Sequence, residues 1–291
     1  MANIKFEQLL DAGCHFGHLK RKWNPNMAPY IFMEQNGIHI IDLYKTIAKM
    51  QEAGDAMKQI AKSGKKILFV GTKKQSKEIV AEVAKKVNMP YVTERWPGGM
   101  LTNFVTIRKA VKKMAHIDKM LNDPSFASIS KRERLQIARE RAKLDKTLGS
   151  IADLNKLPSA LFVVDISKEH IAVAEAQILN IPTFAIVDTN SDPKKVDFPI
   201  PANDDAAKSI SLILHTVAED IQEGLNERKM QKDKADEEEE APKAEVKNEE
   251  VKTEEVKAET AEEVKEEKVE APEEKKEAEP KKKINIDVNE D

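Results

Sequence analysis

Apolar positions in the first 234 residues alternate between short continuous runs and helical stripes. Lys66–Gly71 and Leu161–Ile166 are almost wholly apolar and rich in β-branched and aromatic residues, which predicts two buried strands. Tyr91–Thr93 and Thr183–Val187 predict two more. Strands without polar alternation are typical of a parallel sheet covered by helices on both faces.

Helical stripes separate these strands. The residues Thr72-x-x-Gln75 form the pattern of a capping box and predict the start of a helix. A second helix is expected from Ser167 to about Leu179, and a last one from near Asp204. The apolar stripes of the first and last helices are Ile79, Val80, Val83, Ala84 and Val87, and Ile210, Ile213, Leu214, Val217 and Ile221. The alternation of strands and helices predicts an α/β fold.

A long segment between the strands near 92 and 161 breaks this alternation. Its first half follows a 3-4 apolar spacing, although Asp118 occupies a position that would suit an apolar residue. The apolar positions are Phe104, Ile107, Val111, Met114 and Leu121. After Asp123-Pro124, a second helix is predicted from about Ser130 to Leu148. We expect an antiparallel helical hairpin, of coiled-coil type, inserted at about 104–156 and protruding from the α/β layer.

The charge of the chain divides at residue 235. The formal net charge of −3 combines 48 Lys+Arg with 51 Asp+Glu. Residues 235–291 contain 23 acidic and 11 basic residues, a net of −12, and leave a net of +9 for 1–234. The segment 235–291 has no Leu, Met, Phe, Tyr or Trp, so its burial cannot offset its ordering entropy. We expect a folded basic body over 1–234 and a disordered Glu/Lys-rich tail over 235–291.

Several classes of protein are disfavoured. The longest apolar run, Ala160–Val164, is far too short to span a membrane, and the N-terminus lacks the apolar core of a secretory signal. The single cysteine, Cys14, excludes an intrachain disulfide framework and fits a reducing compartment. These features predict a cytoplasmic protein without a membrane partner.

Nucleotide-binding motifs are weak. The turn Val70–Gln75 has one glycine, so it is neither a dinucleotide-binding turn nor a P-loop. Lys73 and Lys74 lie at a predicted helix start and could still contact a phosphate. A nucleotide-dependent enzyme is the rival interpretation, and it predicts a ligand near Gly71 and Asp188.

Two segments contain metal-binding residue types in incomplete patterns. Asp188–Asp192 begins like a calcium loop, but Pro193 replaces the required glycine and Pro199 the bidentate glutamate. Cys14-His15-x-x-His18 lacks a second cysteine or histidine pair, and no third partner suggests nucleophilic catalysis. We expect no metal site, no cofactor and no catalytic residues, although the sequence leaves open whether Cys14, His15 and His18 bind a metal.

Three basic clusters favour RNA as a partner. Lys20–Pro25 combines three cations with a tryptophan, and Arg95–Gly99 combines one cation with a tryptophan, which suits phosphates and unstacked bases. The predicted hairpin carries the third cluster: Arg108, Lys109, Lys112 and Lys113, then Lys131, Arg132, Arg134, Arg139, Arg141, Lys143 and Lys146. On a body of charge +9 they predict polyanion binding. The alternatives are ordinary solvated helices with core tryptophans, or a hairpin that serves as a protein–protein adaptor.

Three long blocks of sequence follow one another along the chain. The first is Ala12–His18 (AGCHFGH), continued by Trp23–Ile31 (WNPNMAPYI). The second is Arg95–Asn103 (RWPGGMLTN), and the third comprises Ile181–Pro193 and Asp197–Ala206. Together these blocks, spread over roughly residues 5–225, resemble the bacterial small-subunit ribosomal protein two family.

The resemblance implies a flavodoxin-like parallel sheet with a protruding helical hairpin, in a structural, non-catalytic constituent of the small ribosomal subunit. It implies binding of small-subunit rRNA, contacts with neighbouring ribosomal proteins and, in many bacteria, docking of ribosomal protein one. Carried over residue by residue, the RNA contacts fall on the first hairpin helix and on Lys20, Arg21, Lys22, Trp23, Asn24, Arg95 and Asn103. With Lys73, Lys74, Arg108, Lys109 and Lys112 these are the predicted RNA-binding residues. Pro97 departs from the family's leucine-like residue, and the tail has no counterpart in shorter members.

Overall fold

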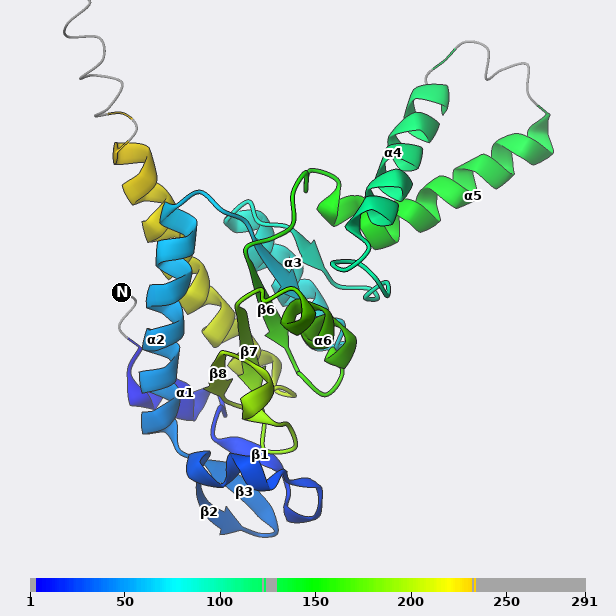
Figure 1. The fold of residues 1–291 in the computed structure, drawn as a ribbon. Coiled ribbons are helices and arrows are strands. Elements are labelled where there is room, and N and C mark those ends of the chain that lie inside the picture. Colours follow the sequence, from blue (N-terminus) through cyan, green and yellow to red (C-terminus); the bar gives the residue numbers. More distant parts are fainter. Residues whose placement is uncertain (1–3, 122, 124–129, 232, 234–291) are drawn as a thin grey trace, which may run out of the picture. The chain divides into compact units, whose positions relative to one another are not determined.

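The computed structural model describes residues 4–121, 123, 130–231 and 233 (Figure 1). The described residues up to 231 belong to one unit, Met1–Lys232. The predicted disordered tail, 235–291, lies outside the described residues. No helix in the described part of the chain is long and apolar enough to cross a membrane.

Five parallel strands form the central sheet. They are β4 (Ile67–Val70), β5 (Tyr91–Val92), β6 (Ala160–Val164), β7 (Thr183–Val187) and β8 (Phe198–Pro201). Their order in the sheet is β5-β4-β6-β7-β8, all parallel. Counted along the chain from β4, this is the 2-1-3-4-5 order of flavodoxin-like folds. The predicted fold class is confirmed.

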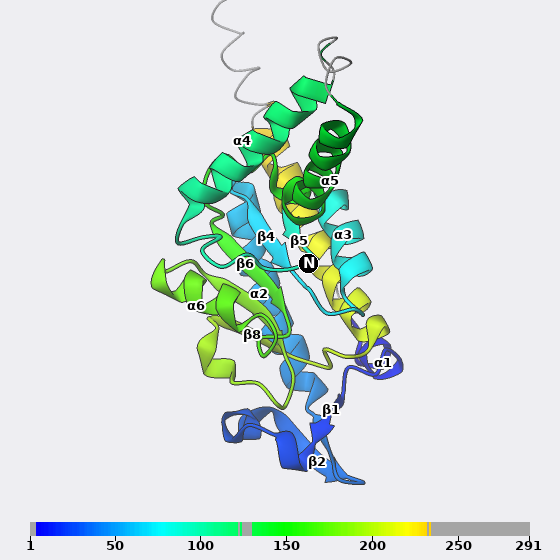
Figure 2. The same ribbon diagram turned by 90° about the vertical axis from the view of Figure 1, so that its right-hand side faces the viewer.

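Both faces of this sheet are covered, because successive side chains of each strand point to opposite sides. Phe69 of β4 belongs to the core cluster built with α2 (Leu43–Lys62), α3 (Lys77–Lys86) and the helical segment 207–231. Val70 belongs to a second cluster with α6 (His170–Ile178) and the base of the hairpin. Figure 2 shows α2 and α6 on opposite sides of the strands.

Two helices begin later than the sequence predicts. The prediction of a capping box at Thr72 is wrong, because α3 begins only at Lys77. The Thr72 hydroxyl and backbone N–H instead donate to the Glu169 carboxylate. Ser167 likewise does not cap α6, since its hydroxyl lies 2.9 Å from that of Ser191. In both cases a tertiary partner takes the side chain that local capping would use.

The hairpin is formed by α4 (Phe104–Leu121) and α5 (Lys131–Leu148), followed by the 3-10 turn η4 (Gly149–Ile151). Val111 and Leu148 join the core cluster beneath it. Farther out, the Arg141 guanidinium donates to Asp118 at 2.9 Å. The predicted apolar gap at Asp118 is therefore filled by an ion pair between the two helices.

The first 62 residues form elements that sequence patterns left unassigned. α1 (Phe6–Asp11) precedes an antiparallel sheet of order β1-β3-β2, formed by β1 (Phe16–Leu19), β2 (Ile31–Gln35) and β3 (Ile38–Ile41). The 3-10 turns η1 (Lys20–Lys22) and η2 (Pro25–Tyr30) connect β1 to β2, and η5 (Pro193–Lys195) precedes β8. In both ribbon views the small sheet and the hairpin lie at opposite ends of the described unit (Figures 1 and 2).

Candidate RNA-binding surface

The first and third sequence blocks meet at the carboxyl edge of the parallel sheet. The backbone N–H of Asn24 donates to the Thr189 carbonyl at 2.8 Å, and the Asn26 amide donates to Asp192 at 3.1 Å. A Cβ added to Gly17 would lie 2.6 Å from the Thr189 side chain, so only glycine allows this approach. The loop after β1 is therefore fixed against the loop after β7.

The predicted cations of the first block differ in their partners. Lys20 pairs with Glu34 at 2.7 Å. Arg21 and Lys22 are exposed in η1 and form no ion pair with any other described residue. These two cations therefore present uncompensated charge to solvent.

Trp23 and Asn24 complete the first-block prediction. The Trp23 side chain is 37 % exposed and packs at a ring-centroid distance of 5.2 Å from His39. The Asn24 side chain accepts the backbone N–H of Asn26 and so caps η2. The partly exposed indole is accessible to a base or sugar, whereas the Asn24 carboxamide oxygen already has a structural role.

The second block is held by one buried carboxylate on α6. Glu175 is 6 % exposed and accepts hydrogen bonds from the Trp96 indole and from the backbone N–H groups of Gly99, Leu101 and Thr102, at 3.1, 2.7, 2.9 and 3.2 Å. Trp96 is a core residue, which is the alternative that the sequence left open for the tryptophans of the basic clusters. The sequence analysis did not identify Glu175, although a lone carboxylate in the apolar helix HIAVAEAQI was a visible signal.

The hydrogen bonds also set the ionisation of Glu175. Burial raises the pKa of its carboxyl, but the Leu101 N–H, the Trp96 indole and the Thr102 and Gly99 N–H groups outweigh burial and lower the pKa below its ordinary value. Glu175 is therefore ionised at neutral pH. A charged acceptor of this kind fixes the loop more firmly than a neutral one would.

Arg95 and Asn103 lie at the two ends of this loop. Arg95 is exposed and has no ion pair within the described part of the chain. The Asn103 carboxamide oxygen accepts from the Thr106 hydroxyl at 2.8 Å, which places Asn103 at the start of α4. Arg95 is free to contact a phosphate, and Asn103 also stabilises the first turn of the hairpin.

The predicted residues of α4 also divide into two kinds. Arg108 donates to the Leu154 carbonyl at 3.0 Å and to the Asn155 side chain at 2.7 Å, so it anchors the hairpin base. Lys109 and Lys112 are exposed and have no ion pair among the described residues. They are three positions apart, which places them on the same helix face.

Lys73 and Lys74 are adjacent in sequence but lie in different environments. Lys74 is exposed. The Lys73 side chain is 14 % exposed, and its ammonium lies 3.1, 2.8 and 2.7 Å from Asp165, Asp204 and Asp205. Burial lowers the pKa of Lys73, but its hydrogen bonds to Asp204 and Asp205 outweigh burial and raise it. Since its charge is already balanced by carboxylates, Lys73 is poorly placed for RNA.

The same carboxylates bear on the nucleotide-enzyme alternative. A ligand at the carboxyl edge of the sheet would meet Asp165, Asp188 and Asp204, all of which are buried there. Negative side chains repel a diphosphate, and the edge carries only one glycine next to β4. The geometry therefore disfavours a nucleotide-dependent enzyme.

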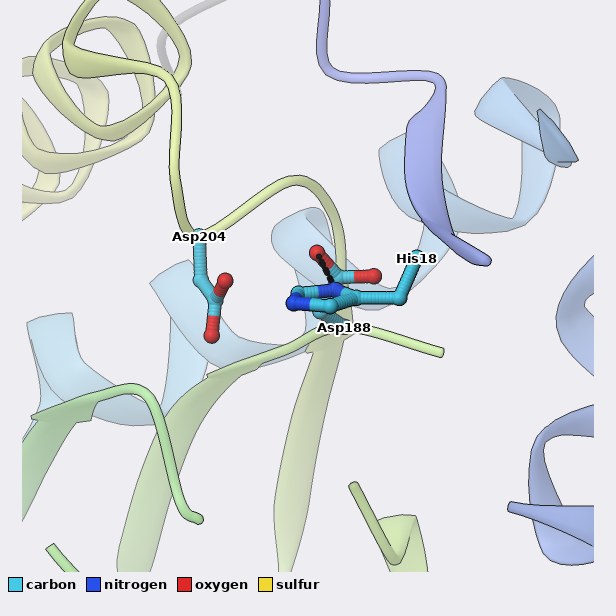
Figure 3. A group of neighbouring side chains, drawn as sticks. All are labelled: His18, Asp188 and Asp204. Carbon is cyan, nitrogen blue, oxygen red and sulfur yellow. Dashed lines mark ion pairs between the residues drawn. The ribbon is translucent and has the colours of Figure 1, made fainter. Parts of the chain in front are cut away.

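The two incomplete metal patterns meet at the contact between His18 of the cysteine–histidine pattern and Asp188 of the calcium-like pattern. Cys14 is wholly buried in the core, where burial raises the pKa of its thiol. Asp192 contacts Asn26 and caps η5 instead of forming a calcium loop. The His18 imidazole lies against the other pattern, with Nδ1 2.9 Å from the Asp188 carboxylate (Figure 3).

The sequence profile of the family described as Ribosomal protein S2 matches residues 9–224. A protein named small ribosomal subunit protein uS2 from Phocaeicola vulgatus is 71 % identical over 232 residues, covering 80 % of this chain and 83 % of that protein. Proteins of the same name from Bacteroides thetaiotaomicron and Christiangramia forsetii are 69 % and 68 % identical, covering 83 % and 84 % of this chain and 87 % and 82 % of their own lengths.

Proposed function

Because the chain belongs to the ribosomal protein S2 family, we propose that it binds small-subunit rRNA through the exposed cations of η1 and α4. Members of this family are structural constituents of the small ribosomal subunit and not enzymes. Its partners are accordingly rRNA and other ribosomal proteins, and its compartment is the bacterial cytoplasm. The task of the surface is to hold phosphates in position, so no reacting group is required.

The contact of the first block with the third carries this proposal. Arg21 and Lys22 lie on a short 3-10 turn, and the next residues are held by Asn24 on Thr189 and Asn26 on Asp192. A rigid loop loses little conformational entropy when it binds. Two uncompensated cations beside a half-exposed indole therefore suit a fixed contact with folded RNA.

The first prediction concerns the salt dependence of this contact. Each phosphate contact releases counterions and contributes about 0.7 to 0.9 to the slope of log affinity against log salt. The double variant Arg21→Ala/Lys22→Ala is expected to make this slope shallower by about 1 to 2. Filter binding of the full chain to small-subunit rRNA at several salt concentrations measures it.

Lys85→Ala/Lys86→Ala is the matched control, because it removes two exposed cations from α3, which carries none of the predicted RNA contacts. Its slope is expected to equal that of the native chain. Equal slopes for both double variants would show that η1 contributes nothing beyond general charge. A native slope near zero would favour the protein–protein adaptor.

We propose in addition that the chain helps to dock ribosomal protein one. The described body has an apolar pocket between α1, the small sheet and the start of α2, lined in part by Phe6, Leu10, Phe16, Phe32 and Tyr44. Phe32 and Tyr44 are 71 % and 73 % exposed. Exposed aromatic side chains around a concave surface support a protein partner better than RNA phosphates.

A double variant tests this docking. Phe32→Ser/Tyr44→Ser is expected to reduce the ribosomal protein one recovered with purified small subunits by about tenfold, as loss of a hot-spot pair does. The amount of the variant chain itself in those subunits is the control and is expected to stay unchanged. Undiminished recovery of ribosomal protein one would contradict docking at this pocket.

A further inference from the structure

His39 is a buried histidine of the small sheet whose ring nitrogens have no partners. It lies on β3 and is 7 % exposed. Neither Nδ1 nor Nε2 forms a hydrogen bond with any described residue. A buried polar atom without a partner destabilises the fold, and native proteins contain few of them. The imidazole therefore points to a role that the described chain does not fulfil by itself.

The Trp23 indole packs against this imidazole. The two ring centroids are 5.2 Å apart, and the ring planes are inclined by 42°. The indole is 37 % exposed, and its N–H forms no hydrogen bond within the described part of the chain. Packing alone therefore holds the indole against His39, and no polar contact has to break when the indole turns away.

The backbone is fixed on both sides of Trp23. The N–H of Lys20 donates to the Gly37 carbonyl at 3.0 Å, and the N–H of Asn24 donates to the Thr189 carbonyl at 2.8 Å. A movement of Trp23 is therefore confined to rotation about its side-chain bonds, which is fast for side chains that reach solvent. The loop stays in place when the indole turns.

His39 faces away from the apolar pocket of the small sheet. Ile40, the next residue on β3, lines that pocket, and successive side chains of a strand point to opposite faces. The exposed cations Arg21 and Lys22 directly precede Trp23 in the chain. A partner that reaches His39 through Trp23 therefore meets free positive charge, which suits RNA and not an apolar protein segment.

We propose that Trp23 and His39 form a binding site for one unpaired RNA base. The indole turns off the imidazole and stacks on the base, and the uncovered nitrogens of His39 bind the edge of the same base. A neutral imidazole offers one N–H donor and one lone pair, which matches the neighbouring donors and acceptors on a base edge. Bases paired in a duplex already use these groups, so the site selects unpaired nucleotides. This inference rests on the proposed rRNA binding, in which Arg21 and Lys22 hold the phosphates.

The site sets the stability of the free chain against its affinity for RNA. In the free chain the two nitrogens of His39 lack partners, whereas a bound base supplies them. An apolar residue at position 39 therefore stabilises the free chain and weakens the complex. A histidine with a purely structural role predicts the opposite change in stability, because its replacement would remove favourable contacts.

Thermal unfolding of the full-length chain tests the free state. His39→Phe keeps a ring without nitrogens and is expected to raise the unfolding temperature by about 2 °C or more. His39→Leu is the second variant, for the case that the phenyl ring is too large. His170→Phe, at the exposed start of α6, is the control and is expected to leave the temperature unchanged. A lower unfolding temperature in both His39 variants would overturn the proposal.

Affinity for a short single-stranded RNA tests the bound state, with the same strand annealed to its complement as the control ligand. Trp23→Ala is expected to weaken binding of the single strand by about 5- to 100-fold, the loss of one stacked base. His39→Phe is expected to weaken it by about threefold to tenfold, the loss of one or two hydrogen bonds. Binding of the duplex should not change in either variant. Tyr44→Ala removes an exposed aromatic side chain from the apolar pocket and is expected to bind both RNAs like the native chain.

Tryptophan fluorescence reports the stacking itself. The chain has two tryptophans, and Trp96 is buried, so quenching by a stacked base is expected from Trp23. Single-stranded RNA is expected to quench the emission, the duplex is not, and Trp23→Phe is expected to abolish the effect. A native chain that binds rRNA without this quenching, or a His39→Phe variant that binds the single strand like the native chain, would overturn the base site alone. A native chain that binds no rRNA would contradict the proposed function as well.

Discussion

Replacement of Glu175 by alanine is expected to lower the free energy of unfolding by about 3 to 5 kcal/mol, as removal of one partner from a buried ionic network does. The change leaves the Trp96 indole and three backbone N–H groups without their acceptor. Water would have to replace this acceptor, and its access is limited because Trp96 and Leu101 are buried. Urea unfolding of the full chain measures the loss.

Two further variants sharpen this prediction. Glu175→Gln keeps the shape and one acceptor oxygen, so it is expected to cost about half as much. Glu82→Ala removes an exposed carboxylate from α3 and is expected to change the free energy of unfolding by less than about 0.5 kcal/mol. If Glu175→Ala were as mild as Glu82→Ala, the loop 96–102 would not depend on Glu175.

The free energy of unfolding at acidic pH gives an independent check on the role of Glu175. The folded pKa of Glu175 lies below the ordinary value of 4.5, so its ionised form stabilises the fold. This contribution to stability is fully present above pH 4.5, and it is lost as the pH falls through the lower pKa of the folded protein. The stability difference between the native chain and Glu175→Gln should therefore narrow below pH 4.5.

The strands and the hairpin were predictable because their signals are local. Thr183–Val187 is predicted and observed with the same bounds, and Lys66–Gly71 contains β4. A continuous apolar run has few alternatives to a buried strand. The hairpin likewise follows from its helical spacing, and Ser130 caps α5 as a local side chain can.

Elements that depend on distant partners were not predictable. β8 contains Pro199 and Pro201, which argue against a strand, yet as an edge strand it needs only one ladder of hydrogen bonds. β2 is almost entirely exposed and shows no alternation. Thr72 and Ser167 fit capping patterns, but their hydroxyls bind Glu169 and Ser191 from other loops.

The sequence alone likewise could not show which of the predicted RNA-binding cations are free. Lys73 and Lys74 are neighbouring lysines that the sequence does not distinguish. The fold places Lys73 among aspartates and Lys74 in solvent. Arg108 resembles Lys109 in the same way, but it is used to anchor the hairpin base. Residue type and family blocks select a region, while the packing decides which cations are free to bind RNA.

The second large effect is expected from reversing the charge of the free cations in both basic regions. The variant is Arg21→Glu/Lys22→Glu/Lys109→Glu/Lys112→Glu, and all four side chains are exposed. At 0.15 M salt each phosphate contact contributes about 0.6 logarithmic units to affinity through counterion release. Loss of four contacts therefore weakens rRNA binding by about 100-fold or more, and repulsion adds to this. The fold should survive, because none of the four side chains is buried.

Sedimentation of the native chain and this variant through a sucrose gradient, from cells that express either one, tests the central claim most directly. Native protein is expected in the small-subunit and whole-ribosome fractions, and the variant at the top of the gradient. A variant with Lys85→Glu/Lys86→Glu on α3 is the control and is expected to sediment like the native chain. A native chain that stays at the top, or a charge-reversed variant that sediments with the subunits as fully as the native chain, would contradict the account.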